Sequence, residues 1–200
     1  MRKHLVRNKN IEKFLYRIYR ESFNEGIGPI SRLEGSILMT LTTLICLKGT
    51  ATLLDAGAGL GFSTAWLILG SALLPNINVT IDVVEYNKNR FEKLVSNIRE
   101  LLNTTQLKRV RINYIFEDVI EYLKKINYQY DLAFIDIEKH QYLDILNILI
   151  DKMRIGGFVV FHNVIEPPPP QVFIEKLHSE PWRTIIIPTR RGLSVSIKLV

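Results

Sequence analysis

A glycine-rich turn at residues 52–65, with the sequence TLLDAGAGLGFSTA, constrains the fold of this chain more than any other feature. A short apolar strand leads into Asp55, glycines follow at positions 57, 59 and 61, and a helical pattern begins at Phe62. Glycine allows a sharp turn and a close approach of a ligand to the backbone, and the helix after the turn presents free N–H groups to an anion. A dinucleotide fingerprint starting at Gly57 would require glycine where Phe62 stands, which disfavours a nicotinamide dehydrogenase. The alternative interpretation is a loop of small residues without a ligand.

Beyond this turn, apolar strands alternate with amphipathic helices. Apolar runs predict strands at residues 79–84, 110–116, 132–135 and 158–161, the last after a turn at Gly156 and Gly157. Helical spacing of apolar residues predicts helices at 87–102, 119–126 and 141–153. This alternation is typical of an α/β fold in which helices cover both faces of a parallel sheet.

The two ends of the chain extend this pattern. Apolar residues at positions 11, 14, 15, 18, 19 and 23 predict a first amphipathic helix, and Ser31 with Glu34 forms a capping box for a second helix at 32–47. Four prolines, residues 167–170, indicate either a stiff extended segment over the ligand edge of the sheet or a plain spacer. A short helix at 172–177 and strands at 182–187 and 193–199 complete the chain, and the last strand could return antiparallel. We expect residues 1–200 to form one domain with a basic helical extension over about residues 1–25.

Polar residues end the predicted strands. The carboxyl ends of parallel strands meet at one edge of a sheet, where ligands bind in open α/β folds. The residues expected at that edge are Asp55, Glu85, Asp118, Asp136, His162 and Asn163. Their convergence is the strongest functional signal that the residues themselves give.

Composition narrows the class of protein. Hydrophobic residues make up 47% and charged residues 23% of the 200, as in an ordinary globular protein. The single cysteine, Cys46, can form no intramolecular disulfide, which suits a reducing compartment. The first residues lack the apolar core of a signal peptide, and no apolar run reaches the ~20 residues of a membrane span. We therefore expect a cytoplasmic protein without stable membrane insertion.

Residues 1–20 contain seven basic residues and one acidic residue, Glu12, so this segment alone accounts for the net charge of +6. The remaining residues sum to zero. Such a segment can contact phosphate backbones or an anionic membrane surface, or it can be a solvated helix face.

The glycine-rich turn, read as D-x-G-x-G-x-G-x-S from Asp55 to Ser63, resembles motif I of the class I S-adenosylmethionine-dependent methyltransferases. Four further stretches are similar to the catechol O-methyltransferase-like group: GPISRLEGSILM at 28–39, DLAFIDIEKHQY at 131–142, RIGGFVVFHNVI at 154–165 and RGLSVSIK at 191–198. The resemblance covers nearly the whole chain beyond the first ~25 residues. It implies a Rossmann-like sheet of seven strands, mostly parallel, with helices on both faces and the last strand antiparallel.

The resemblance also implies roles for the residues of the turn and the strand ends. S-adenosylmethionine would bind on Gly57, Gly59 and Gly61, with Asp55 holding its ammonium group and Ser63 adding a hydroxyl donor. Glu85 suits the ribose hydroxyls, because a carboxylate can accept from both. Asp118 could accept from the adenine amino group, and it could also cap the helix that follows. Asp136 is expected to contact the cofactor as well.

In the resembled family, strand-end aspartates and an asparagine bind a divalent cation that grips the acceptor, and a nearby lysine is the base. Asp136, Asn163 and Lys139 match these positions, but His162 stands where the family has its second aspartate. Magnesium prefers oxygen ligands, whereas manganese tolerates imidazole, so a metal here would be weakly bound, different or absent. A neighbouring cation would lower the pKa of Lys139, which ties the lysine to the metal. Without both, His162 is the alternative base.

The leading hypothesis is therefore methylation of a hydroxyl on a small, catechol- or phenol-like acceptor. A methyltransferase that acts on RNA, recognised through the basic N-terminus, is one alternative. A non-catalytic cofactor-binding protein is another. A homodimer is compatible with each of them.

Overall fold

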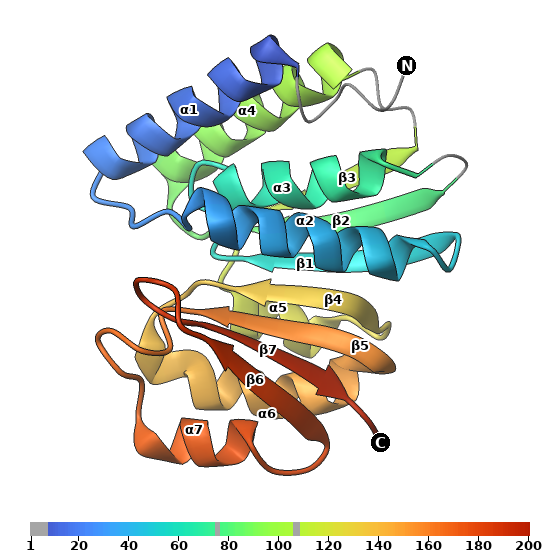
Figure 1. Cartoon of the computed structure of the whole chain (residues 1–200), viewed down its shortest axis with the longest axis vertical. Helices are drawn as coiled ribbons and strands as arrows, with labels where there is room; N and C mark the ends of the chain where they lie inside the picture. Colours follow the sequence, from blue (N-terminus) through green and yellow to red (C-terminus); the bar gives the residue numbers. More distant parts are fainter. Residues whose placement is uncertain (1–7, 75–76, 106–108) are drawn as a thin grey trace.

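A seven-stranded sheet forms the middle of the molecule in the computed structural model, which describes residues 8–74, 77–105 and 109–200 (Figure 1). The strands are β1 Thr50–Ala56, β2 Asn78–Val84, β3 Val110–Ile115, β4 Tyr130–Ile135, β5 Met153–His162, β6 Trp182–Ile187 and β7 Leu193–Lys198. The α-helices are α1 Lys9–Asn24, α2 Arg32–Cys46, α3 Phe62–Ala72, α4 Lys88–Thr105, α5 Val119–Lys125, α6 Tyr142–Lys152 and α7 Gln171–Leu177, with a 3-10 turn, η2, at Lys139–Gln141.

The strand order is β3-β2-β1-β4-β5-β7-β6. Strands β1 to β5 pair in parallel, whereas β7 runs antiparallel to both β5 and β6. Strand order reverses between β1 and β4, which places a crevice at their carboxyl ends. The predicted α/β fold, with its Rossmann-like seven-stranded sheet and antiparallel last strand, is confirmed.

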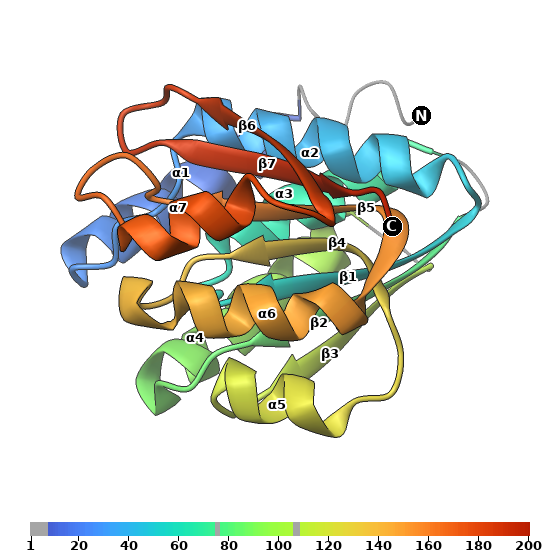
Figure 2. The ribbon, with the colours of Figure 1, turned by 90° about the horizontal axis from the view of Figure 1, so that it is seen from below.

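Helices cover the two faces of the sheet as separate layers. Buried side chains of α1, α2, α3 and α4 form one apolar core with one face, and those of α5, α6 and α7 form another core with the opposite face. Figure 2 shows α5, α6 and α7 together on the near side of the sheet. In α1, Ile11, Phe14, Leu15 and Ile18 are buried, so this part of the predicted extension belongs to the core.

The start of β5 differs from the predicted turn at Gly156 and Gly157. The strand begins at Met153, which pairs with Tyr130 of β4, and the register shifts before Phe158 pairs with Leu132. Gly156 lies within the strand with φ of 77°, a left-handed conformation that glycine adopts without strain. The glycines therefore accommodate an irregularity in one long strand, because pairing with β4 already starts at Met153.

The helix starts follow local chemistry closely. Ser31 Oγ accepts from Glu34 N, and Glu34 Oε2 accepts from Ser31 N at 2.6 Å, so the predicted capping box is confirmed. Phe23, predicted on the apolar face of α1, is instead 65% exposed, whereas its neighbour Ser22 is 1% exposed. Within the described ranges, no helix has the length and apolarity that a membrane crossing requires.

Candidate functional site

A cavity of about 750 Å³ opens at the carboxyl ends of the parallel strands. Gly57 and Gly59 line it after β1, Glu85 after β2, and Asp118 after β3. Asp136 after β4 and Asn163 after β5 complete its strand-end lining. The structure thus brings together most of the residues that the sequence places at this edge.

The glycine-rich turn forms one wall of the cavity. Gly57 has φ of 80°, and a Cβ atom there would overlap the backbone carbonyl oxygen of Asp136. Gly59 N donates to Glu85 Oε2 at 2.9 Å, which fixes the turn to the end of β2. Gly61 caps the N-terminus of α3 in the left-handed conformation. Side chains at these positions would block both the turn and the approach of a ligand to it.

Asp55 lies behind this wall and does not line the cavity. Its side chain is fully buried and accepts from Ser63 Oγ at 2.9 and 3.0 Å and from Thr64 Oγ1 at 2.5 Å. Burial raises the pKa of Asp55 to about 7, although the two hydroxyl groups oppose this rise. Asp55 therefore braces the first turn of α3, whereas Ser63 lines a small adjoining hollow together with Asp136.

Glu85 and Asp118 keep acceptor capacity toward the cavity. Glu85 is 3% exposed, and its two oxygens accept from the backbone N–H groups of Gly59 and Asn87. Each carboxylate oxygen has a second lone pair that remains available. Asp118 Oδ1 caps α5 by accepting from Ile120 N and Glu121 N, and this leaves Oδ2 for another donor. The predicted capping role of Asp118 is thus present alongside its place in the cavity wall.

His162 lies between two carboxylates and is 1% exposed. Its Nδ1 is 3.1 Å from Asp136 Oδ2, and its Nε2 is 3.5 Å from Glu34 Oε1. Burial by itself would lower the pKa of His162, but the two facing carboxylates outweigh it and raise the pKa to about 9. For Glu34, burial is likewise outweighed, mainly by His162 and Thr189, and its pKa falls to about 2.

The predicted metal ligands do not fit a divalent cation as a set. Both ring nitrogens of His162 face carboxylate oxygens, Nδ1 that of Asp136 and Nε2 that of Glu34, so neither points toward an open coordination position. Asp136 is engaged by His162 and, at 3.5 Å, by Asn163 Nδ2. Across residues 8–74, 77–105 and 109–200, no group of three or more His, Cys, Asp or Glu side chains is arranged to hold a metal ion. His162 itself does not line the cavity, and its role as the alternative base stays a prediction.

Lys139 faces the cavity beside Arg191. Its ammonium group donates to the carbonyl oxygen of Pro167. Burial, followed by the Arg191 charge, lowers the pKa of Lys139, while Asp136 acts in the opposite direction. From the sequence, a lowered pKa of Lys139 was expected to need a neighbouring metal ion. In the structure the neighbouring cation is the guanidinium group of Arg191.

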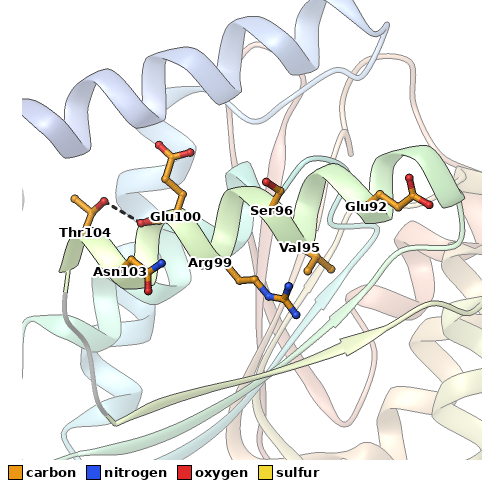
Figure 3. A pocket seen from close by; sticks show the side chains of 7 residues that line it. All are labelled: Glu92, Val95, Ser96, Arg99, Glu100, Asn103 and Thr104. Carbon is orange, nitrogen blue, oxygen red and sulfur yellow. Dashed lines mark hydrogen bonds between the residues drawn. The ribbon is translucent and has the colours of Figure 1, made fainter.

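Another hollow, of about 670 Å³, lies along α4 and carries no comparable chemistry (Figure 3). All its lining residues, from Glu92 to Thr104, come from this one helix. The hydrogen bond drawn there joins Thr104 Oγ1 to the carbonyl oxygen of Glu100 within the helix. This surface is the solvated face of a helix.

A seven-stranded α/β sheet with a glycine turn and an acidic residue after β2 is typical of proteins that bind a nucleoside-containing ligand at the switch point. A sequence-family model described as a methyltransferase domain matches residues 54–164, which is more than half of the chain. The chain belongs to this methyltransferase family, and the predicted class is confirmed.

Solved structures share the fold at low sequence identity. An O-methyltransferase from Bacillus cereus in complex with SAH has a TM-score of 0.71 and 18% identity, covering 93% of this chain and 90% of that one. The O-methyltransferase TomG from Streptomyces achromogenes, involved in tomaymycin synthesis and in complex with SAM, has a TM-score of 0.71 and 19% identity over 94% and 90%. An SAH-bound methyltransferase from Podospora anserina has a TM-score of 0.73 and 17% identity over 96% and 88%.

Two residues of the site carry no functional role in the sequence-based prediction. Glu34 is recognisable only as the third residue of a capping box, yet it contacts His162, which lies 128 positions further along the chain. Arg191 follows another arginine before a glycine and gives no sign of its place beside Lys139. Both contacts depend on the tertiary fold.

Proposed function

We propose that this protein transfers the methyl group of S-adenosylmethionine to a hydroxyl oxygen of a small acceptor. The observation that carries the proposal is the cavity at the switch point, in which the glycine turn and Glu85 stand side by side. The family membership and the SAM- and SAH-bound structures of the same fold support it.

The polar groups of the cavity suggest one orientation for the donor. Glu85 would accept from the ribose hydroxyls with its remaining lone pairs, and Asp118 Oδ2 would accept from the adenine amino group. The methionine end would lie against Gly57 and Gly59 and enter the hollow lined by Ser63 and Asp136. Asp55 supports this end through Ser63 rather than by direct contact.

The acceptor end of the cavity is cationic. Lys139 and Arg191 both line it, and neither makes an ion pair in the part of the chain that the structure describes. Gly28 leaves room for the Arg191 guanidinium group, because a Cβ atom there would overlap it. Arg191 stays charged throughout the reaction and favours an acceptor with an anionic group, so our finer proposal is a catechol- or phenol-like acid.

The chemistry required from the protein is modest. The sulfonium of the bound donor supplies an already activated methyl group. Lys139, with its lowered pKa, would take the proton of the acceptor hydroxyl. Asp136 and Asn163 also line the cavity and would accept hydrogen bonds from hydroxyl groups of the acceptor. In-line placement of the oxygen and the methyl group is then the main catalytic contribution.

The test begins with calorimetry of S-adenosylmethionine and S-adenosylhomocysteine, followed by a radiolabelled methyl-transfer assay. The acceptors are catechol, 3,4-dihydroxybenzoate and bulk tRNA. We expect micromolar binding of both nucleosides and transfer to a hydroxybenzoate. Transfer to tRNA alone, lost on removal of residues 1–20, would establish the RNA alternative instead. Binding without transfer to any acceptor would favour a non-catalytic protein, and the absence of binding would refute the proposal.

A further inference from the structure

The Glu34–His162–Asp136 contact is an ion triad assembled from three distant elements. Glu34 comes from the first turn of α2, Asp136 follows β4, and His162 ends β5. The His162 side chain is 2% exposed and the Glu34 side chain 4% exposed, so water screens this triad little. The imidazole ring is held from both of its nitrogens.

Further contacts fix the Glu34 carboxylate and the backbone at His162. Glu34 Oε1 accepts from Thr189 Oγ1 at 2.5 Å, and Glu34 Oε2 accepts from Ser31 N at 2.6 Å. The backbone carbonyl of His162 accepts from Tyr142 Oη at 2.7 Å, which fixes the end of β5. Rotation of the ring to present a free nitrogen would leave two buried carboxylates without this partner, which is unfavourable.

We propose that the His162 ring, which stands where the resembled family has its second aspartate, contacts Asp136 in place of a divalent metal, and that this protein binds donor and acceptor without a metal there. The proposal rests on the proposed function for the acceptor, but its metal-binding part stands by itself. The ring contacts Asp136 Oδ2 from behind the cavity, with its Nδ1 at 3.1 Å. It does not line the cavity, so it acts through Asp136 as a positioning residue.

Asn163 provides an oxygen that can bind the acceptor directly, without a metal between them. Its Oδ1 is buried and has no hydrogen-bond partner among the described residues, and the backbone of Asn163 is left-handed with φ of 57°. A buried carbonyl oxygen without a donor favours a hydrogen-bonding ligand. An acceptor hydroxyl bound to Asn163 Oδ1 and Asp136 would satisfy this oxygen without chelation by a cation.

Manganese binding to the metal-free protein tests the proposal directly. Electron paramagnetic resonance of a Mn²⁺ titration, with and without S-adenosylhomocysteine, measures the bound fraction in the wild-type chain. We expect no saturable site up to about 1 mM Mn²⁺, which corresponds to binding weaker than ~4 kcal/mol. A micromolar site in the wild-type chain that disappears in Asn163→Ala would overturn the proposal.

The variant His162→Asp provides the opposite readout. It replaces the imidazole by a carboxylate next to Asn163 and recreates the ligand set of the resembled family, so we expect at least tenfold tighter Mn²⁺ binding. Should this variant fail to fold, the wild-type titration still decides the question. Methyl transfer by the wild-type protein should also be unchanged by a chelator, and a tenfold loss that Mn²⁺ or Mg²⁺ restores would contradict the proposal. Failure of the donor to bind would instead refute the proposed function.

Discussion

At the residue scale, we expect recognition of the donor to depend most on the Glu85 side chain. Replacing it by glutamine keeps the shape but removes the charge and one acceptor. Loss of hydrogen bonds to a charged group costs ~1.5–3 kcal/mol, so we expect about a 10- to 100-fold weaker binding of S-adenosylhomocysteine in Glu85→Gln by calorimetry. Glu92→Gln, on the exposed face of α4, is the matched control and should bind within twofold of the wild type. Equal binding by both variants would show that the ribose lies elsewhere.

Arg191 is predicted to select the acceptor. In Arg191→Gln we expect KM for 3,4-dihydroxybenzoate to rise about tenfold, because a charge-assisted contact to the carboxylate is lost. The same variant should leave KM for catechol nearly unchanged, since catechol carries no carboxylate. This pair of substrates is its own control for folding. A parallel rise for both substrates would indicate a structural role for Arg191.

The His162 triad predicts a pH dependence of stability. The folded pKa of about 9 lies above the ordinary value of 6.5, so its contribution to the free energy of unfolding is complete below pH 6.5 and is lost as pH rises through 9. Each pKa unit corresponds to ~1.4 kcal/mol, which makes the loss a few kcal/mol. Urea unfolding at pH 6.5, 7.5 and 9 should show this decline in the wild type and in the exposed His178→Gln control. A similar decline in His162→Gln would assign it to other groups.

At the scale of the elements, Asp82 of β2 joins three strands and a helix around one buried carboxylate. Its Oδ2 accepts from the hydroxyls of Tyr122, Tyr128 and Tyr130 at 2.8, 2.6 and 2.7 Å, and its Oδ1 accepts from Asn113 Nδ2 at 2.7 Å. These donors come from β3, α5, the loop after α5 and β4. The cluster therefore fixes how these elements pack against one another.

Removing this carboxylate should destabilise the fold without touching the donor cavity. In Asp82→Ala the donors around it lose their acceptor, and each buried unsatisfied group costs ~1–3 kcal/mol, so we expect at least ~3 kcal/mol lower free energy of unfolding. Tyr130→Phe removes only one donor and should cost about 1 kcal/mol. Urea denaturation measures both, with Tyr16→Phe, 61% exposed, as the control. A loss below 1 kcal/mol in Asp82→Ala would show that the cluster is not a stabilising network.

Asp82 also illustrates how far sequence reasoning reaches. The strand and helix periods, the glycine turn and the acids after β2 and β3 are local signals, and they predicted the elements and most of the cavity wall. The partners of Asp82 and of His162 lie between 26 and 128 positions away, and no local pattern encodes these contacts. The predicted start of β5 was wrong for the same reason. The pairing of Met153 with Tyr130 begins the strand before the two glycines, which by themselves indicate a turn.

At the scale of the whole molecule, the donor cavity joins two halves of one sheet. Glu85 and Asp118 follow strands on one side of the switch point, whereas Asp136 and Asn163 follow strands on the other. A ligand that contacts both sides stabilises only the folded arrangement, since the unfolded chain has no such cavity. Binding must therefore appear as increased thermal stability of the entire domain.

A hundredfold excess of S-adenosylhomocysteine over its Kd should add ~2.7 kcal/mol to the free energy of unfolding. For a chain of this length, that gain raises Tm by roughly 5–10 °C, at ~2–4 °C per kcal/mol, and scanning fluorimetry can measure it. Nicotinamide adenine dinucleotide at the same concentration should leave Tm unchanged, because Phe62 replaces the glycine that its pyrophosphate needs. Glu85→Gln at this fixed concentration should show a smaller shift, by about 1.4 kcal/mol for each tenfold loss of affinity. An equal response to both nucleotides would mean that the cavity binds nucleosides without recognising the methyl donor.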